Sequence, residues 1–548
     1  MCGNTVNIDS SNTQRTRFGE TTIGNCIMFT IDGQENLRLM YEKMRQAKSS
    51  IYIANYDLDP DLSLVRGDLQ SFHIFDLVAS PCRSESLITT NNSDNDNGPN
   101  NNNRNNDKYH SLQDLLIEKA RQKVDIKILV WEPRLIIRKL PGIKKRGLEG
   151  REKKIEVIKQ LAKDYDLEHR ISIRLDSKAP TSTSGFHEKI TIIDNQIGFC
   201  GGQDFSKDKW DTSDHDFDNT LRDKGGEPWH DVHAMVKGPI VWDLIYHFNQ
   251  RWVYSIWKDI QQVKKIVNAS SMGAYLSSSF PYSHLAALSS TNDGDVEITA
   301  LRTWKRMDEK NDTNTEGGNS IQSWYDSMFK RAKHSIYIED QFLFQDKAIT
   351  QILVNRLREE EDLKIITVGP MEPNLPGFIF SVIAKESIND INYNLTSLRK
   401  AGKNRVRTYS LISQHHRFKE RRKQIYVHSK LMIVDDKWIT IGSANTDRDG
   451  FSDSTEFDLS VVSTTLAQEV RVKLWREHLK IDAQSSSNSN LYDFDDGFKA
   501  WEQLADDNGK RIRNNEAIRG HVYYYNFEEM NCPPPYPAAK GGNRFRLV

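Results

Sequence analysis

"GFHEKITIIDNQIGFCGG", residues 185–202, places reactive polar side chains inside an apolar, β-branched run. A second stretch, "YVHSKLMIVDDKWITIGSAN" at residues 426–445, repeats the pattern. In both, a lysine follows a histidine by two positions, and an aspartate follows the lysine by five. The repeated residues are His187, Lys189 and Asp194 in the first stretch and His428, Lys430 and Asp435 in the second.

Strand geometry predicts how these side chains are arranged. Side chains two apart in a strand share a face, so each histidine should project together with its lysine. Asp194 and Asp435 should lie on the opposite face or in the turn that ends the strand, where they brace the site. Small-residue turns follow each strand at "CGGQD" and "GSAN". Glycine there would let backbone N–H groups approach an anion.

The chain is written twice. Residues 40–58, "MYEKMRQAKSSIYIANYDL", parallel residues 324–343, "WYDSMFKRAKHSIYIEDQFL", and "DIKILVW" at 125–131 parallels "DLKIITVG" at 362–369. Helical stretches that alternate with apolar strands predict βαβ units and a largely parallel sheet. We therefore expect an α/β fold in which two similar α-β-α halves pack into one bilobal monomer.

Composition shifts suggest the domain boundaries. Residues 88–110 hold an Asn-rich tract that cannot bury apolar surface and is expected to be a disordered loop. Residues 270–294 are rich in Ser and Ala and should link the halves. The expected organisation is a polar N-terminal tail at 1–33, a first half at 34–269, a linker at 270–294, a second half at 295–482 and a partly packed C-terminal segment at 483–548.

Bulk properties exclude some classes of protein. A net charge of −1 means that any anionic partner must be held by local patches. The N-terminal residues lack a signal-peptide core, and no apolar run is long enough to span a membrane. Five scattered cysteines fit a reducing compartment better than a disulfide framework. We expect a cytoplasmic protein that associates peripherally with membranes.

Two facing halves would bring two imidazoles and two ammonium groups into one pocket, which suits a phosphodiester. One histidine would attack phosphorus while the other protonates the leaving alkoxide and then activates water. Lysines would neutralise the nonbridging oxygens, so no metal or other cofactor is expected. A single His-x-Lys is typical of a satisfied histidine beside a surface lysine. Two copies in a duplicated framework favour catalysis, because unpaired buried charge is costly.

At the level of motifs the sequence resembles the phospholipase D superfamily, whose signature HxKxxxxD occurs here twice as "HEKITIID" and "HSKLMIVD". "GGQDFSKDKWD", "EPWHDVHAMVKGPIVWDLIYHFNQRW" and "IYIEDQF" resemble segments of its eukaryotic-type branch. Departures are Lys209, where arginine is usual, and Asp340 and Phe342 in the last segment. The resemblance covers roughly residues 34–508 and is dense in motifs.

The resemblance implies roles for individual residues. His187 would be the nucleophile and His428 the general acid and base, although the two halves look alike. Each histidine would be oriented by a downstream carboxylate, for which Asp231 and Glu456 are the candidates. The implied catalytic set is His187, Lys189, Asp194, His428, Lys430 and Asp435, and the implied phosphate-binding or pocket set is Gly202, Asp204, Ser443 and Asn445.

The leading interpretation is a phospholipase D that hydrolyses a glycerophospholipid, with phosphatidylcholine as first candidate, to phosphatidic acid and a free alcohol. A primary alcohol in place of water would give transphosphatidylation. Alternatives are a nuclease-type phosphodiesterase, a phosphatidyltransferase such as a cardiolipin synthase, and a non-catalytic membrane-binding protein. The residues before position 34 are too few for the lipid-binding modules of longer relatives, so the catalytic body or a partner should contact the membrane.

Two basic segments, 133–154 and 398–424, are the candidate contacts with anionic lipid. Solvated loops or a nucleic-acid backbone would explain the same charges. Because both half-sites are on one chain, a monomer suffices.

Overall fold

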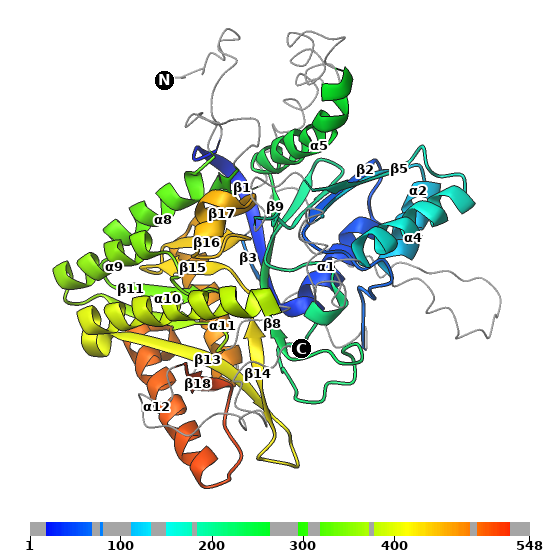
Figure 1. Cartoon of the computed structure of the whole chain (residues 1–548). Coiled ribbons are helices and arrows are strands. Elements are labelled where there is room, and N and C mark those ends of the chain that lie inside the picture. Colours follow the sequence, from blue (N-terminus) through cyan, green and yellow to red (C-terminus); the bar gives the residue numbers. More distant parts are fainter. Residues whose placement is uncertain are drawn as a thin grey trace, which may run out of the picture.

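The structure is a computed structural model that describes residues 18–67, 77–80, 111–132, 150–177, 184–263, 294–304, 318–371, 378–482 and 490–525. The Asn-rich tract, nearly all of the 270–294 linker and residues 133–149 of the first basic segment lie outside these ranges. Two sheets with helices on their outer sides face each other (Figure 1). One half is flanked by α1 (Asp32–Arg45), α2 (Leu112–Arg121) and α4 (Gly150–Asp164), and the other by α8 (Ser320–Arg331), α9 (Lys347–Glu359) and α10 (Phe378–Gly402).

Both sheets have the same strand order. In the first half it is β5-β4-β2-β6-β7-β9-β1, and in the second half it is β13-β12-β11-β15-β16-β17-β10. The first set spans β1 Thr21–Ile31, β2 Ser50–Asn55, β4 Asp125–Trp131, β5 Ile171–Asp176, β6 Ile190–Ile193, β7 Ile197–Gly201 and β9 Val232–Lys237. The second spans β10 Val296–Thr303, β11 Ser335–Glu339, β12 Lys364–Val368, β13 Val406–Gln414, β15 Leu431–Val434, β16 Trp438–Gly442 and β17 Glu456–Val462. The expected duplicated α/β fold is confirmed.

The prediction of a largely parallel sheet is wrong. Within the two seven-stranded sheets, β2, β4 and β5, and their counterparts β11, β12 and β13, pair in parallel, and the other pairings are antiparallel. The strands that follow the histidines, β6 and β15, are antiparallel to both of their neighbours. The reason is that short turns, rather than helical crossovers, connect β6 to β7 and β15 to β16.

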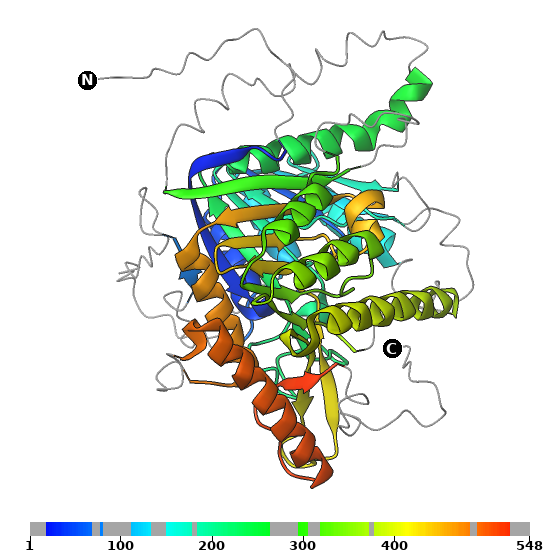
Figure 2. The ribbon, with the colours of Figure 1, turned by 90° about the vertical axis from the view of Figure 1, so that its left-hand side faces the viewer.

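Helices cover the outer faces, and short strands complete the fold. The helices are α1 Asp32–Arg45, α2 Leu112–Arg121, α4 Gly150–Asp164, α5 Val241–Val263, α8 Ser320–Arg331, α9 Lys347–Glu359, α10 Phe378–Gly402, α11 Thr464–Leu479 and α12 Phe494–Arg513. The short or peripheral strands are β3 Val78–Ala79, β8 Trp229–His230, β14 Arg422–Val427 and β18 Val522–Tyr524. The β13–β14 hairpin and α12 extend from the same end of the molecule (Figure 1 and Figure 2).

The two sheets are joined through β1. Residues 26–31 of this strand pair with β9 of the first half, while Thr21, Thr22 and Asn25 pair with β10 of the second. A shared core of buried side chains continues across the junction, including Phe29, Ile298 and Leu459. Burial of such side chains is worth about 1.5–3 kcal/mol each, so the contact between the halves is part of the core.

Two sequence expectations change here. Residues 21–31, assigned above to a polar tail, form the buried strand β1. Cys26 on that strand is disulfide-bonded, so the inference of a reducing, cytoplasmic compartment loses its support. No helix within the described ranges is long and apolar enough to cross a membrane. In the C-terminal segment, α12 packs Trp501 against Tyr409 of β13, and β18 pairs with β13.

Candidate active site

His187 is held by the opposite half of the molecule. It lies in the extended segment just before β6, not within the strand as the sequence reading assumed. Its backbone N–H donates to the Thr455 carbonyl oxygen at 2.8 Å. Its ring Nδ1 lies 3.1 Å from Oε2 of Glu456 and 3.0 Å from the Ser443 carbonyl oxygen. The second half therefore fixes both the backbone and the ring of this histidine.

His428 is held in the reciprocal way. Its ring Nδ1 lies 2.7 Å from Oδ2 of Asp231, and its N–H donates to the His230 carbonyl oxygen at 2.8 Å. Tyr426 and Val427, just before it, pair with β8 of the first half. Each imidazole thus has a carboxylate from the other half at Nδ1. Within the described residues, Nε2 of neither ring is hydrogen-bonded, which leaves that nitrogen for substrate chemistry.

The charges of both halves act on these rings. Burial lowers the pKa of His187 well below its usual value, and Lys189, Lys430 and Lys209 lower it further. Burial likewise lowers the pKa of His428, followed by the same three lysines and by His187 itself. The same three lysines therefore act on both imidazoles, and an anionic ligand beside them would offset this repulsion.

The two motif lysines are buried but differently paired. Nζ of Lys189 donates to the His187 carbonyl oxygen at 2.7 Å and lies 3.5 Å from Oδ1 of Asp204. Nζ of Lys430 donates to the His428 carbonyl oxygen and lies 3.3 Å from Oε1 of Gln341. Burial lowers the pKa of both lysines, and that of Lys430 falls to about 8.

Asp204 is placed as a counter-ion rather than as a phosphate ligand. Besides Lys189, it forms a buried ion pair with Lys209, whose pKa it raises against the effect of burial. A carboxylate that neutralises two lysines would repel a phosphate. Asn445 occupies the equivalent position in the second half, fifteen residues after Lys430, just as Asp204 follows Lys189 by fifteen. Its buried Oδ1 has no hydrogen-bond partner among the described residues.

The turns after β7 and β16 do not offer the expected anion-binding amides. The N–H of Gly202 donates to Val232, and the N–H of Ser443 donates to Oδ1 of Asp458. Gly202 instead makes room for the carboxylate of Asp231, because a Cβ there would lie 1.9 Å from its Oδ1. The Ser443 hydroxyl donates to Oε2 of Glu456 at 2.6 Å. Both turn residues therefore position the carboxylates that hold the histidines.

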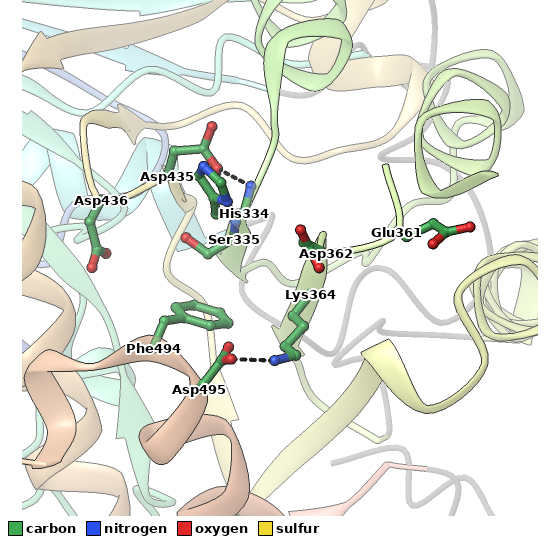
Figure 3. Close-up of a pocket in the computed structure, with 9 residues that line it drawn as sticks. All are labelled: His334, Ser335, Glu361, Asp362, Lys364, Asp435, Asp436, Phe494 and Asp495. Carbon is green, nitrogen blue, oxygen red and sulfur yellow. Dashed lines mark hydrogen bonds and ion pairs between the residues drawn. The ribbon is translucent and has the colours of Figure 1, made fainter. Parts of the chain in front are cut away.

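Asp194 and Asp435 bind backbone, not the histidine–lysine cluster. Both have positive φ in the turns after β6 and β15. Asp194 accepts from the N–H groups of residues 48–50, and Asp435 from those of residues 333–335. Asp435 lines a surface pocket of about 390 Å³ together with His334, Lys364 and Asp495 (Figure 3). Asp194 and Asp435 therefore do not belong to the catalytic set, and their role is to brace the backbone around the site.

Aromatic rings lie beside both histidines, and the sequence did not predict them. On one side Tyr56 stacks on Trp131 at 4.6 Å between ring centroids and meets the edge of His187 at 5.0 Å. On the other, Trp229 stacks on Tyr426 at 4.7 Å and lies 5.0 Å from His428. Tyr56 follows β2, and Gln341 follows the equivalent strand β11 of the second half. A comparison of these two positions in the repeat could have identified Tyr56 and Gln341 as site residues.

Arg251 fixes the direction in which successive side chains of the first motif point. Its guanidinium binds Glu188 and Asp176 at 2.7 and 2.8 Å and covers the ring of Phe186 at 3.4 Å. Glu188 lies between His187 and Lys189, so anchoring it on Arg251 turns both neighbours away from that arginine. This buried ion-pair network fixes the direction in which the motif residues project.

Similarity to known proteins agrees with this geometry. Residues 101–349 match the family described as "Phospholipase D" and residues 325–477 match "Cardiolipin synthase, PLD-like domain". Phospholipase D alpha 4 of Arabidopsis thaliana is 24% identical over 82% of this chain and 64% of its own length. Phospholipase D alpha 1 of Vigna unguiculata is 26% identical over 67% and 58%. The chain therefore spans about three fifths of the length of these relatives.

A solved structure, phosphatidylserine synthase of Haemophilus influenzae, superposes with a TM-score of 0.50 at 11% identity, over 89% of this chain and 94% of that one. This likeness concerns the fold alone. The two family matches together extend over both copies of the motif, and the relatives are of the eukaryotic type. The chain belongs to the phospholipase D superfamily.

Proposed function

We propose that the protein is a phospholipase D, which cleaves the distal phosphodiester bond of a glycerophospholipid to give phosphatidic acid and a free alcohol. The observation that carries the proposal is the reciprocal pairing in which each histidine is held at Nδ1 by a carboxylate of the other half. Phosphatidylcholine is the first substrate to test. The names of the curated relatives support the same reaction.

The reaction is assigned as a double displacement. Nε2 of His187 attacks phosphorus, and the alkoxide of the headgroup leaves with a proton from His428. His428 then takes a proton from water, which attacks the phosphohistidine and releases phosphatidic acid. Glu456 and Asp231 hold the two rings through Nδ1, while Lys189 and Lys430 stabilise the nonbridging oxygens. His187 is the more open of the two rings, at 15% side-chain exposure against 5% for His428, which favours it as nucleophile.

Phosphatidyl transfer to an alcohol is the second candidate. It is favoured by the match of residues 325–477 to a domain described for cardiolipin synthase. Both reactions share the phosphohistidine and differ only in whether water or an alcohol accepts the phosphatidyl group. The ratio of transfer to water and transfer to alcohol therefore decides whether the enzyme is a hydrolase or a phosphatidyltransferase.

The membrane contact is assigned to the tip of the β13–β14 hairpin. Residues 416–421 are exposed and include Arg417, Lys419 and Arg421, with Phe418 at 49% exposure between them. An apolar ring among basic side chains suits insertion between anionic headgroups. β14 runs from this tip to His428. The hairpin therefore connects the proposed membrane contact directly to the candidate site.

The deciding experiment mixes the purified protein with phosphatidylcholine vesicles and a short primary alcohol. Phosphatidic acid and the phosphatidyl-alcohol should both form, and His187→Ala and His428→Ala should abolish both. His169→Ala changes an exposed histidine outside both motifs, serves as control and should be unaffected. Cleavage of single-stranded DNA without lipid turnover would overturn the proposal, and product that contains only the alcohol adduct would favour the transferase.

A further inference from the structure

Lys209 carries an ammonium group that lies close to both half-sites, although it belongs to neither motif. Its Nζ is 5.9 Å from the ring centroid of Tyr56 and 5.9 Å from that of Trp229. The ring of Tyr56 contacts His187 and the ring of Trp229 contacts His428, with centroids 5.0 Å apart in each case. One ammonium group is thus near the aromatic neighbour of each histidine.

The charge of Lys209 acts on both imidazoles. Burial, Lys189 and Lys430 lower the pKa of His187 most, and Lys209 follows them. For His428, burial and Lys430 lower the pKa most, and Lys209 comes next, ahead of Lys189. Because the interaction between charges falls with distance, this double effect agrees with the position given by the two aromatic rings.

The loop that carries Lys209 is fixed by hydrogen bonds to its backbone. The residue ends the short 3₁₀ helix η3, Lys207–Lys209, between β7 and β8. Its carbonyl oxygen accepts from Nε2 of Gln203 at 3.0 Å, and its N–H donates to the Ser206 carbonyl oxygen at 3.2 Å. A side chain on such a supported backbone is held in one direction, as a ligand-binding group needs to be.

The ammonium group keeps hydrogen-bonding capacity for a ligand. Within the described ranges its partner is the carboxylate of Asp204, and an ammonium group has three N–H donors. The side chain of Lys209 is 12% exposed, whereas those of Lys189 and Asp204 are fully buried. Lys209 is therefore the more accessible of the two lysines that share this carboxylate.

The charges around Asp204 do not cancel. Its Oδ1 lies 3.5 Å from Nζ of Lys189 and its Oδ2 binds Lys209, so one carboxylate serves two ammonium groups. Two other carboxylates act on Lys209, but Asp57 is already paired with basic residues of α4 and Asp208 is exposed to solvent. A buried surplus of positive charge is costly unless it is paired, and an anionic ligand would supply the missing partner.

We propose that Lys209 is a third substrate-binding lysine, which donates a hydrogen bond to a nonbridging oxygen of the phosphodiester beside Lys189 and Lys430. The inference rests on the proposed function and adds to it a residue outside both motifs. The phosphoryl centre would meet one ammonium group from each motif and one from the loop between β7 and β8. Burial lowers the pKa of Lys430 to about 8, whereas Asp204 holds that of Lys209 above its usual range, so Lys209 keeps its charge when Lys430 loses its proton.

Binding of inorganic phosphate to the purified full chain tests the proposal without turnover. By titration calorimetry Lys209→Met should bind phosphate about tenfold more weakly than wild type, because one charged hydrogen bond is lost. Lys209→Arg, which keeps the charge, should stay within about threefold. Lys207→Met is the control and should bind phosphate like wild type, since Lys207 lies in the same loop but pairs with Asp61 at the surface.

Sulfur-substituted lipids separate substrate binding from neutralisation of Asp204. Replacing one nonbridging oxygen by sulfur gives two stereoisomers, and sulfur is the weaker hydrogen-bond acceptor. In wild type the isomer whose sulfur faces Lys209 should react more slowly than the oxygen lipid. In Lys209→Met this rate ratio should shrink by at least about threefold for that isomer and stay unchanged for the other. The ratio does not depend on how much of the enzyme is folded.

The outcomes distinguish this inference from the proposed function. Wild-type phosphate affinity in Lys209→Met would overturn the inference, as would a sulfur effect that changes for neither isomer or equally for both. Lys209 would then be only the partner of Asp204. Phosphate binding that depends on Lys209 without cleavage of any lipid would keep the third lysine and overturn the phospholipase reaction instead. If Lys209→Met does not fold, Lys209→Gln, which can still donate to Asp204, gives the same test.

Discussion

The two half-sites share a frame but differ in charge. In the first, Lys189 faces the carboxylate of Asp204, which also binds Lys209. In the second, the neutral Asn445 takes the place of Asp204, and Lys430 lies 3.3 Å from the neutral Gln341. Duplication therefore preserved the positions of the histidines and lysines while the surroundings diverged. The first half-site is a fixed ionic cluster, and the second holds a lysine whose proton is easily lost.

The largest test of this division separates the roles of the histidines. His187→Asn and His428→Asn should each lower lipid hydrolysis by at least about 10²–10⁴-fold. A phosphodiester with a p-nitrophenol leaving group needs no general acid, so His428→Asn should still release one equivalent of nitrophenol in a burst. His187→Asn should show no burst in rapid-quench measurements. A burst in His187→Asn alone would exchange the two roles.

Replacing Asp204 by the asparagine of the second half tests whether the ionic cluster stabilises the first half-site. Asp204→Asn gives the first half-site the side chain of the second, and it leaves the buried Lys189 and the half-buried Lys209 without their shared carboxylate. The free energy of unfolding, measured in urea, should fall by about 3–5 kcal/mol. Asp208→Asn, an exposed residue of the same loop, is the control and should change stability by no more than about 0.5 kcal/mol. Equal stability of the two variants would show that the ionic cluster is not needed.

The second half-site should set the alkaline side of the pH profile. The pKa of Lys430 is lowered to about 8, so this lysine is charged below that pH and loses its proton as the pH rises through it. If the charged form binds the phosphate, kcat/KM should fall about tenfold per pH unit above the pKa. Lys430→Arg should lower the rate but move the alkaline limb beyond pH 10. If the alkaline limb of the pH profile is unchanged in Lys430→Arg, the fall in kcat/KM comes from the titration of another group.

The smallest expected effect lies at the hairpin tip, which has no counterpart near His187 among the described residues. Phe418→Ala and Lys419→Glu should each weaken binding to vesicles that contain anionic lipid by about 1 kcal/mol, close to fivefold. Soluble substrates should be cleaved at the wild-type rate. Lys163→Glu changes an exposed charge on α4 and serves as control in vesicle sedimentation. Equal losses in all three variants would argue against a specific contact.

Local patterns were enough for the duplicated fold and for the histidine–lysine pairs, because repeats and strand alternation are readable along the chain. The strand β1 was missed because "TTIGNCIMFTI" mixes polar residues and glycine with apolar ones and has no regular period. Asp231 and Glu456 could be named, but their exchange between halves depends on tertiary packing. The same holds for Trp229, whose ring approaches His428 only after the halves meet, whereas Tyr56 contacts His187 within the first half.

Because β1 supplies hydrogen bonds to both sheets, separating the repeats would remove the strand pairing that joins them. A fragment that ends before residue 264 would leave the outer edge of that strand unpaired, and a fragment that begins after residue 293 would lack its neighbour for β10. Two repeats that look like independent foldons should therefore melt as one cooperative unit.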